Sequence, residues 1–187
     1  MQHLVPRIYD CVVQPRLWPD LLQDIAREAG AFGAMIFDCE THDGQESVRL
    51  RQASSVYDPE VVAQYVAAQN AHEVQDQARF ATLSSRGDEV NLIRCDDLFS
   101  GRAELESRPN VQAMMQMGIH YRAGALLSKD TLSLDRFALQ FRHAQGAIAE
   151  EKRLHVQGIL HHVAKVVIHW PRICGGAGAK YRPRCCP

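Results

Sequence analysis

The segment from Tyr121 to Arg142 constrains the fold more than any other part of this sequence, because it contains two strand-like stretches with almost nothing between them. Tyr121 to Ser128 leads into a Lys129-Asp130 turn, and Leu132 to Arg142 returns. Strands joined by so short a turn pair antiparallel. Along the returning strand large apolar residues alternate with others: Phe137, Leu139 and Phe141 against Ala138, Gln140 and Arg142. We therefore expect one packed face and one partly wet face.

A second hairpin and several amphipathic helices complete the pattern. Ala34 to Cys39 predicts a buried strand, Asp43-Gly44 is a hairpin signal, and Val48 to Arg51 alternates on the far side. The polar stretch 72–88 predicts a short helix and a loop, and Val90 to Ile93 predicts a strand. Apolar residues recur at helical spacing in the stretches 2–13, 18–29, 59–71, 107–117 and 149–170. This order, with helices on one side of the strands, predicts an α+β fold with a mainly antiparallel sheet and flanking helices.

Length and charge restrict the class of protein. A chain of 187 residues, 46% of them hydrophobic, suits one globular domain. The formal net charge of −1 lacks the basic excess of a general nucleic-acid binder. No apolar run approaches the roughly 20 residues needed to span a bilayer, and the N-terminus has no apolar signal core. We expect a cytoplasmic protein with no membrane partner and no direct nucleic-acid binding by this chain.

The C-terminal end differs in composition from the rest. Residues 171–187 are rich in Gly, Pro, Cys and basic side chains, contain no acid, and show neither a helical nor a strand period. We therefore expect one domain over residues 1–170, followed by a basic and poorly ordered tail over 171–187.

Cysteine and histidine supply the only candidates for catalytic or metal chemistry. Cys11, Cys39 and Cys95 are isolated, which predicts free and mostly buried thiols. The cysteines at 174, 185 and 186 lack the Cys-x₂₋₄-Cys spacing of a zinc site, and His155, His162 and His169 recur every seven residues, too far apart for one ion. Phosphate-loop, dinucleotide and hydrolase motifs are absent, so we predict no cofactor, no metal and no catalytic residues. The alternative, a small enzyme using Cys39 or a histidine cluster, requires a thiol with a lowered pKa in an open cleft.

A small-molecule pocket under the sheet is the first candidate site. Large apolar side chains on two strands and a tyrosine on a helix could converge there: Met35, Phe37, Cys39, Tyr65, Leu139 and Phe141. Apolar cavities with a few polar groups are the usual form of such sites. The alternative is that these residues simply fill the core.

The terminal helix is the second candidate site. Its apolar residues fall at spacings of 3, 4, 3 and 4: Val156, Ile159, Val163, Val166 and Trp170. Such a seam suits a partner helix in a dimer, but it covers only about two heptads where a coiled coil needs three or four. Packing on the chain's own sheet is the alternative.

Several motifs along the chain resemble a known bacterial family. They are Ile8-Tyr9-Asp10, Pro15-x-x-Trp18, Gly30-Ala31-x-x-Ala34, Asp96-Asp97-Leu98-Phe99 and Gly118-Ile119-x-Tyr121-x-Ala123-Gly124. Over about residues 4–170 the chain resembles the PAS- or GAF-like N-terminal sensor regions of LuxR-type helix-turn-helix transcription regulators. The resemblance implies a mainly antiparallel sheet with helices packed around it, often with a small cavity between them.

We therefore predict a non-enzymatic sensor domain that binds a small ligand or a protein partner and forms a homo- or heterodimer through its terminal helix. Full-length members of the family carry a C-terminal DNA-binding domain, for which the residues after Trp170 are too few. A pure dimerisation adaptor without a ligand, and the small enzyme using a Cys or a His, are the alternatives.

Overall fold

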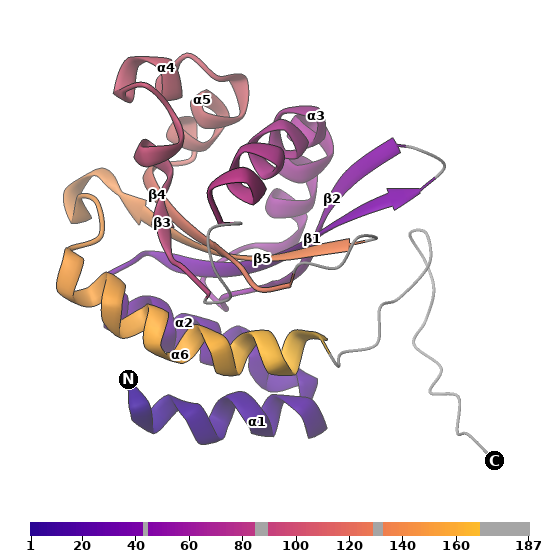
Figure 1. Cartoon of the computed structure of the whole chain (residues 1–187), viewed down its shortest axis with the longest axis vertical. Helices are drawn as coiled ribbons and strands as arrows, with labels where there is room; N and C mark the ends of the chain where they lie inside the picture. Colours follow the sequence, from indigo (N-terminus) through magenta and orange to yellow (C-terminus); the bar gives the residue numbers. More distant parts are fainter. Residues whose placement is uncertain (43–44, 85–89, 129–132, 169–187) are drawn as a thin grey trace.

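The computed structural model describes residues 1–42, 45–84, 90–128 and 133–168 (Figure 1). None of the helices in these ranges is long and apolar enough to cross a membrane. In chain order the elements are η1 (Gln2–Leu4), α1 (Val5–Val13), η2 (Pro15–Leu17), α2 (Trp18–Ala29), β1 (Gly33–His42), β2 (Gln45–Ala53), α3 (Pro59–Ser84), β3 (Ile93–Arg94), η3 (Cys95–Leu98), α4 (Arg102–Glu106), α5 (Pro109–Gln116), β4 (Ile119–Leu126), β5 (Ser133–Arg142), η4 (His143–Gln145) and α6 (Glu150–Ile168).

The strands form one antiparallel sheet in the order β2-β1-β5-β4-β3. The predicted α+β class and both hairpins are therefore confirmed, although the two turns, at 43–44 and 129–130, lie outside the described residues. β1 and β5 occupy the centre, and their register runs without a shift from Gly33 opposite Gln140 to Glu40 opposite Ser133. The strand predicted at Val90 to Ile93 is only the two-residue β3.

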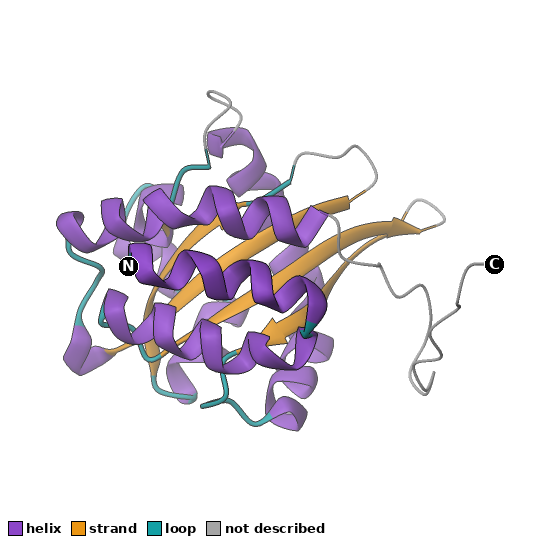
Figure 2. Ribbon diagram, turned by 90° about the horizontal axis from the view of Figure 1, so that it is seen from below, coloured by secondary structure: helices purple, strands orange, loops and turns teal. Residues whose placement is uncertain are grey.

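Helices cover both faces of the sheet, so the expectation of helices on one side was wrong. α2 and α6 lie against one face with α1 packed on their outer side, and α3, α4 and α5 lie on the other (Figures 1 and 2). Phe137, Leu139 and Phe141 of β5 pack into the core formed with α1, α2 and α6. Ala138 and Gln140 point to the other face and are also buried, because α3 and α5 cover it. The prediction of a partly wet face therefore fails at these two positions.

Local signals define the boundaries of two helices as the sequence predicts. α2 ends at Gly30, which adopts φ +74° and donates its N–H to the carbonyl of Arg27. A left-handed residue at this position favours glycine. α3 begins after Asp58, whose Oδ1 accepts the N–H of Glu60 at 2.8 Å. Such a cap satisfies one of the free donors of the first turn.

α3 continues much further than its hydropathy predicts. It is one helix of 26 residues, whereas the polar stretch from residue 72 onward was expected to be a short helix and a loop. The reason is that its polar side chains face the sheet: Glu73, Asp76 and Gln77 are 2–3% exposed. Glu73 and Asp76 pair with arginines there, so polarity does not mark solvent exposure in this helix.

The apolar seam of α6 packs inside the chain. Val156, Ile159 and Val163 are fully buried and Val166 is 4% exposed, in one cluster with α1, α2 and the sheet. Packing on its own sheet, the alternative left open by the sequence, is what the structure shows. A dimer formed through these side chains would require α6 to leave the sheet, and it stays a prediction. Trp170, the last residue of the seam, lies outside the described residues.

Two substitutions on α6 test this packing. Ile159→Ala is expected to lower the free energy of unfolding by about 2–5 kcal/mol, because it leaves a cavity in the core. Leu154→Ala, on the same helix at a side chain that is 52% exposed, is expected to change it by less than about 0.5 kcal/mol. Urea unfolding measures both. An Ile159→Ala protein of unaltered stability whose molar mass in light scattering falls from dimer to monomer would instead identify the seam as a subunit interface.

Candidate functional site

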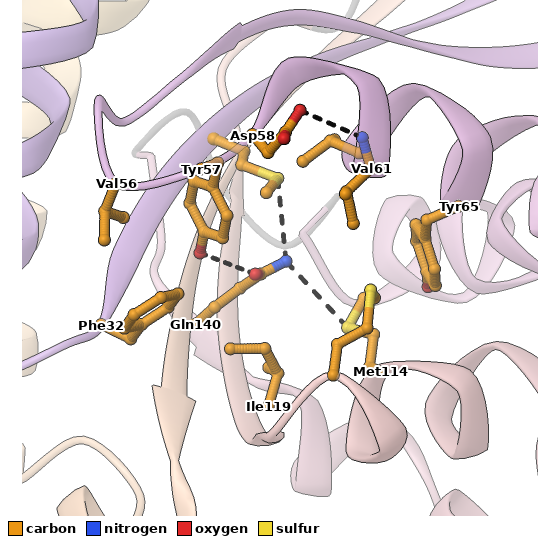
Figure 3. Close-up of a pocket in the computed structure, with 12 residues that line it drawn as sticks. Phe32, Val56, Tyr57, Asp58, Val61, Tyr65, Met114, Ile119 and Gln140 are labelled. Atoms are coloured by element: carbon orange, nitrogen blue, oxygen red, sulfur yellow. Dashed lines mark hydrogen bonds between the residues drawn. The ribbon is translucent and has the colours of Figure 1, made fainter.

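A cavity of about 150 Å³ lies between the sheet and the helices α3 and α5 (Figure 3). On the sheet side its wall is built from β1, β4 and β5. On the helix side it is built from the β2–α3 connection, α3, and α5 with Met117 just after it. The residues that line it are Phe32, Met35, Val56, Tyr57, Asp58, Val61, Val62, Tyr65, Met114, Met117, Ile119 and Gln140. Most of them are apolar, as in most small-molecule sites.

Gln140 of β5 places an amide group in the middle of this apolar wall (Figure 3). Its Oε1 accepts a hydrogen bond of 2.7 Å from the Tyr57 hydroxyl. Within the described part of the chain its Nε2 faces only two thioether sulfurs, Met35 Sδ at 3.8 Å and Met114 Sδ at 4.0 Å. Thioether sulfur is a weak acceptor. The N–H groups of Gln140 can therefore still donate to a ligand in the cavity. They can do so although the residue as a whole is only 5% exposed.

Gly33 gives Tyr57 its place in the cavity wall. A Cβ atom at this position would lie 2.7 Å from the Tyr57 hydroxyl oxygen and still closer to the nearest atom of its ring. The ring therefore lies directly against the backbone of β1, and it meets Phe32 edge to face with ring centres 5.4 Å apart. A glycine inside a strand often marks such a close approach.

The entrance of the cavity is apolar and open to solvent. Val56, Val61 and Met117 line it and are 43%, 47% and 43% exposed. Asp58 also lines the cavity, but its carboxylate is engaged as the cap of α3. An entrance of this kind admits an apolar molecule without first requiring a charged group to lose its water.

Tyr65 connects the cavity wall to a buried network of charges. Its hydroxyl donates to Glu73 Oε1 at 2.6 Å, and Glu73 pairs with Arg122 at 3.3 Å and Arg136 at 3.1 Å. Burial opposes the ionisation of Glu73, but the two guanidinium groups outweigh it and lower its pKa to about 2. Burial, together with the nearby Glu73 carboxylate, raises the pKa of Tyr65. The tyrosine therefore stays a neutral donor.

A second acid extends the network to α5. Asp76 pairs with Arg108 at 2.7 Å and lies 3.6 Å from Arg122. Asn110 of α5 donates from Nδ2 to Asp76 at 2.7 Å and to Glu73 at 2.9 Å. These bonds hold α3, α5 and the sheet in one arrangement behind the cavity.

The structure brings together only some of the predicted pocket residues. Met35 and Tyr65 line the cavity. Phe37 and Cys39 lie on the same face of the sheet, in the apolar cluster with Val62, but do not line it. Leu139 and Phe141 are buried on the opposite face, because Met35 pairs with Ala138 and the next residue of β5 points the other way.

Sequence reasoning missed the residues that give the cavity its polar character. Gln140 stood at a position predicted to be partly wet, and Tyr57 stood just before the helix cap at Asp58. A polar residue within the apolar alternation of β5 was the one available signal for Gln140. Tyr57 carried no comparable signal, because its ring is placed by Gly33, Phe32 and Gln140, which are all distant from it in the sequence.

The three cysteines within the described residues do not have the properties of reactive thiols. Cys11, Cys39 and Cys95 are free and buried. Burial raises the pKa of Cys11 and of Cys39 to about 11, and it also raises the pKa of Cys95. The alternative of an enzyme acting through Cys39 required the opposite, since the thiolate is the nucleophile.

The histidines of α6 lie at the protein surface. His155 is exposed, and the His162 Nδ1 is hydrogen-bonded to the hydroxyl of Tyr9 of α1 at 2.8 Å. Within the described ranges no group of three or more His, Cys, Asp or Glu residues could hold a metal ion. His169 and the cysteines at 174, 185 and 186 lie outside those ranges.

Among solved structures, the chain is similar to the ligand-binding domain of VqsR from Pseudomonas aeruginosa. The TM-score is 0.60 at 13% sequence identity, and the match covers 88% of this chain and 96% of that one. At this identity the likeness shows the shared fold alone, an α+β fold with one antiparallel sheet and helices on both of its faces. No protein-family model matches the sequence, and neither does any curated protein.

The ion pairs of Glu73 predict a specific response to acid. The pKa of Glu73 in the folded state, about 2, lies below its ordinary value of 4.5, so its charge stabilises the fold fully above pH 4.5 and this contribution is lost as the pH falls toward 2. Glu73→Gln should lower the free energy of unfolding at pH 7 by about 3–5 kcal/mol, because it leaves two buried arginines undercompensated.

The same substitution should make the loss of stability between pH 4.5 and 2 shallower, by up to about 1.4 kcal/mol per pH unit. Urea unfolding over this range measures both effects. Glu151→Gln, at an exposed position of α6, is the matched control and should stay within about 0.5 kcal/mol of the wild type. Equal stability of the Glu73→Gln and Glu151→Gln proteins at pH 7 would show that the network is not needed for the fold.

Proposed function

We propose that this chain is a non-enzymatic sensor domain that binds a small, largely apolar molecule in the cavity between the sheet, α3 and α5. The observation that carries the proposal is the buried Gln140 amide, whose N–H groups face only thioether sulfur within an apolar wall. A buried donor without a strong acceptor costs free energy, so its presence in a native protein calls for an explanation, and a missing binding partner is one. A ligand that accepts a hydrogen bond from Gln140 would remove this cost.

The fold supports a regulatory role rather than an enzymatic one. VqsR is a LuxR-type regulator, and the part of it that matches this chain is its ligand-binding domain. The motifs that this chain shares with the sensor regions of such regulators point in the same direction. The enzyme alternative relied on Cys39 or a histidine cluster, and the raised pKa of the Cys39 thiol argues against the first of these.

The cavity limits the size of the ligand. An engineered apolar cavity of about 150 Å³ in another protein holds benzene, and the cavity here has the same volume. We therefore expect the part of the ligand that enters it to be about as large as one aromatic ring. It should carry a single acceptor that reaches Gln140.

The response to ligand would be conformational. The cavity wall is shared among the sheet, α3, α5 and the β2–α3 connection, so a bound molecule changes the packing between separate segments. It can shift the domain toward one arrangement only by the difference between its affinities for the two arrangements. Tyr65, which lines the cavity and donates to Glu73, would transmit the shift to the charges that hold α3 and α5.

Benzyl alcohol tests the cavity, because it joins a benzene ring to one hydroxyl acceptor. A dissociation constant on the order of 1 mM corresponds to about −4 kcal/mol, within the range that so small a ligand can reach. At ten times that concentration it should stabilise the fold by about 1.4 kcal/mol. Differential scanning calorimetry should then record a rise in Tm of roughly 3–6 °C.

Two glycine substitutions make this test specific. Gly33→Ala forces Tyr57 away from β1, so it should abolish most of the rise in Tm produced by benzyl alcohol. Gly158→Ala, whose added Cβ meets nothing within 4 Å, should keep the full rise. An equal rise for both variants would place benzyl alcohol outside the cavity, and no rise for any protein would reject the proposed function.

A further inference from the structure

We propose that the ligand of this cavity carries a carboxylate, which Arg142 binds at the entrance while the apolar body of the ligand lies beside Gln140. This inference rests on the proposed function, because it concerns the ligand of the same cavity. It adds a residue that does not line the cavity and a chemical class for the molecule that enters it.

Arg142 stands beside the rim of the cavity. It follows Gln140 by two residues on β5, and side chains two apart on a strand lie on the same face. Its partner across the sheet is Ile119, which lines the cavity. Its guanidinium carbon lies 4.0 Å from the centre of the Phe32 ring, which also lines the cavity. The residue as a whole is exposed to solvent.

Arg142 differs from the other arginines on this face of the sheet in having no acidic partner. Arg122 and Arg136 are both paired with Glu73, whereas Arg142 forms no ion pair within the described ranges. A guanidinium stacked on a ring keeps its N–H groups directed outward in its own plane. That planar edge matches the two oxygens of a carboxylate.

The other groups around the entrance leave this positive charge uncompensated. The Asp58 carboxylate accepts the N–H groups of Glu60 at 2.8 Å and Val61 at 3.5 Å, so it is balanced by the positive end of α3. Next to Arg142 and Ile119 in the chain, His143 packs on His120 with ring centres 5.0 Å apart, and neither ring can carry a negative charge. An anion at the entrance is therefore favoured over a cation.

Cavity and charge together define the class of ligand. The cavity accepts about one aromatic ring, and the guanidinium lies beside its entrance. A compact monocarboxylic acid satisfies both conditions, with its ring or short branched chain inside and its carboxylate at the rim. Benzoate is the simplest probe of this class, and benzamide is its uncharged counterpart of nearly the same shape.

Isothermal titration calorimetry of the full chain at pH 7 and low salt tests the inference. Benzoate should bind about tenfold more tightly than benzamide, as expected for one charge-assisted interaction. In Arg142→Gln the two affinities should agree within about twofold. Arg16→Gln removes the same charge at another exposed site, between α1 and α2, and should keep the tenfold preference. Added salt should reduce that preference in the wild type.

The outcomes separate the two proposals. If benzamide binds as tightly as benzoate and Arg142→Gln alters neither, the carboxylate inference is wrong while the cavity remains a binding site. If benzoate keeps its preference in Arg142→Gln, another group binds the carboxylate and the role of Arg142 is refuted. If neither probe binds the wild type, the proposed function and this inference fail together.

Discussion

The pairing of Glu73 with Arg122 and Arg136 is the interaction on which one side of this molecule depends. Both arginines stand on a sheet face that α3 covers, and a buried guanidinium must be paired to be tolerated there. Glu73 supplies the charge for both. α3 is therefore held over the sheet by ion pairs as well as by its apolar residues near the start. Tyr65 donates a hydrogen bond to the same glutamate and also lines the cavity, so it connects the ion pairs to the cavity wall.

The two faces of the sheet consequently have different roles. On the face covered by α1, α2 and α6 a large apolar cluster is continuous from Leu4 to Val167, and it includes the fully buried Trp18. On the α3 face the apolar cluster is smaller and shares the surface with charges and with the cavity. Binding on the incompletely packed face can change the packing of α3 and α5 while the other core stays intact. That division suits a domain that must respond to a ligand without unfolding.

Much of this fold follows from signals that lie close together in the sequence. α2 and its end at Gly30 follow from a local apolar period and one glycine, and the hairpins follow from short turns. The full length of α3 does not, because the partners of Glu73 lie 49 and 63 residues away. Only some of the residues that line the cavity could be predicted, for a similar reason. Alternation shows that Leu139 shares a face with its neighbours two residues away, but not which face carries the cavity.

The central claim is that a small molecule enters the space around Gln140, and the methionines offer the most direct measurement of it. The chain has five, of which Met35, Met114 and Met117 line the cavity and Met1 and Met115 do not. With ¹³C-methyl methionine, a titration with benzyl alcohol followed by NMR should shift the first three signals along one saturating curve and leave Met1 unchanged. Shifts that are equal for Met1 and Met35, or that never saturate, would contradict the account.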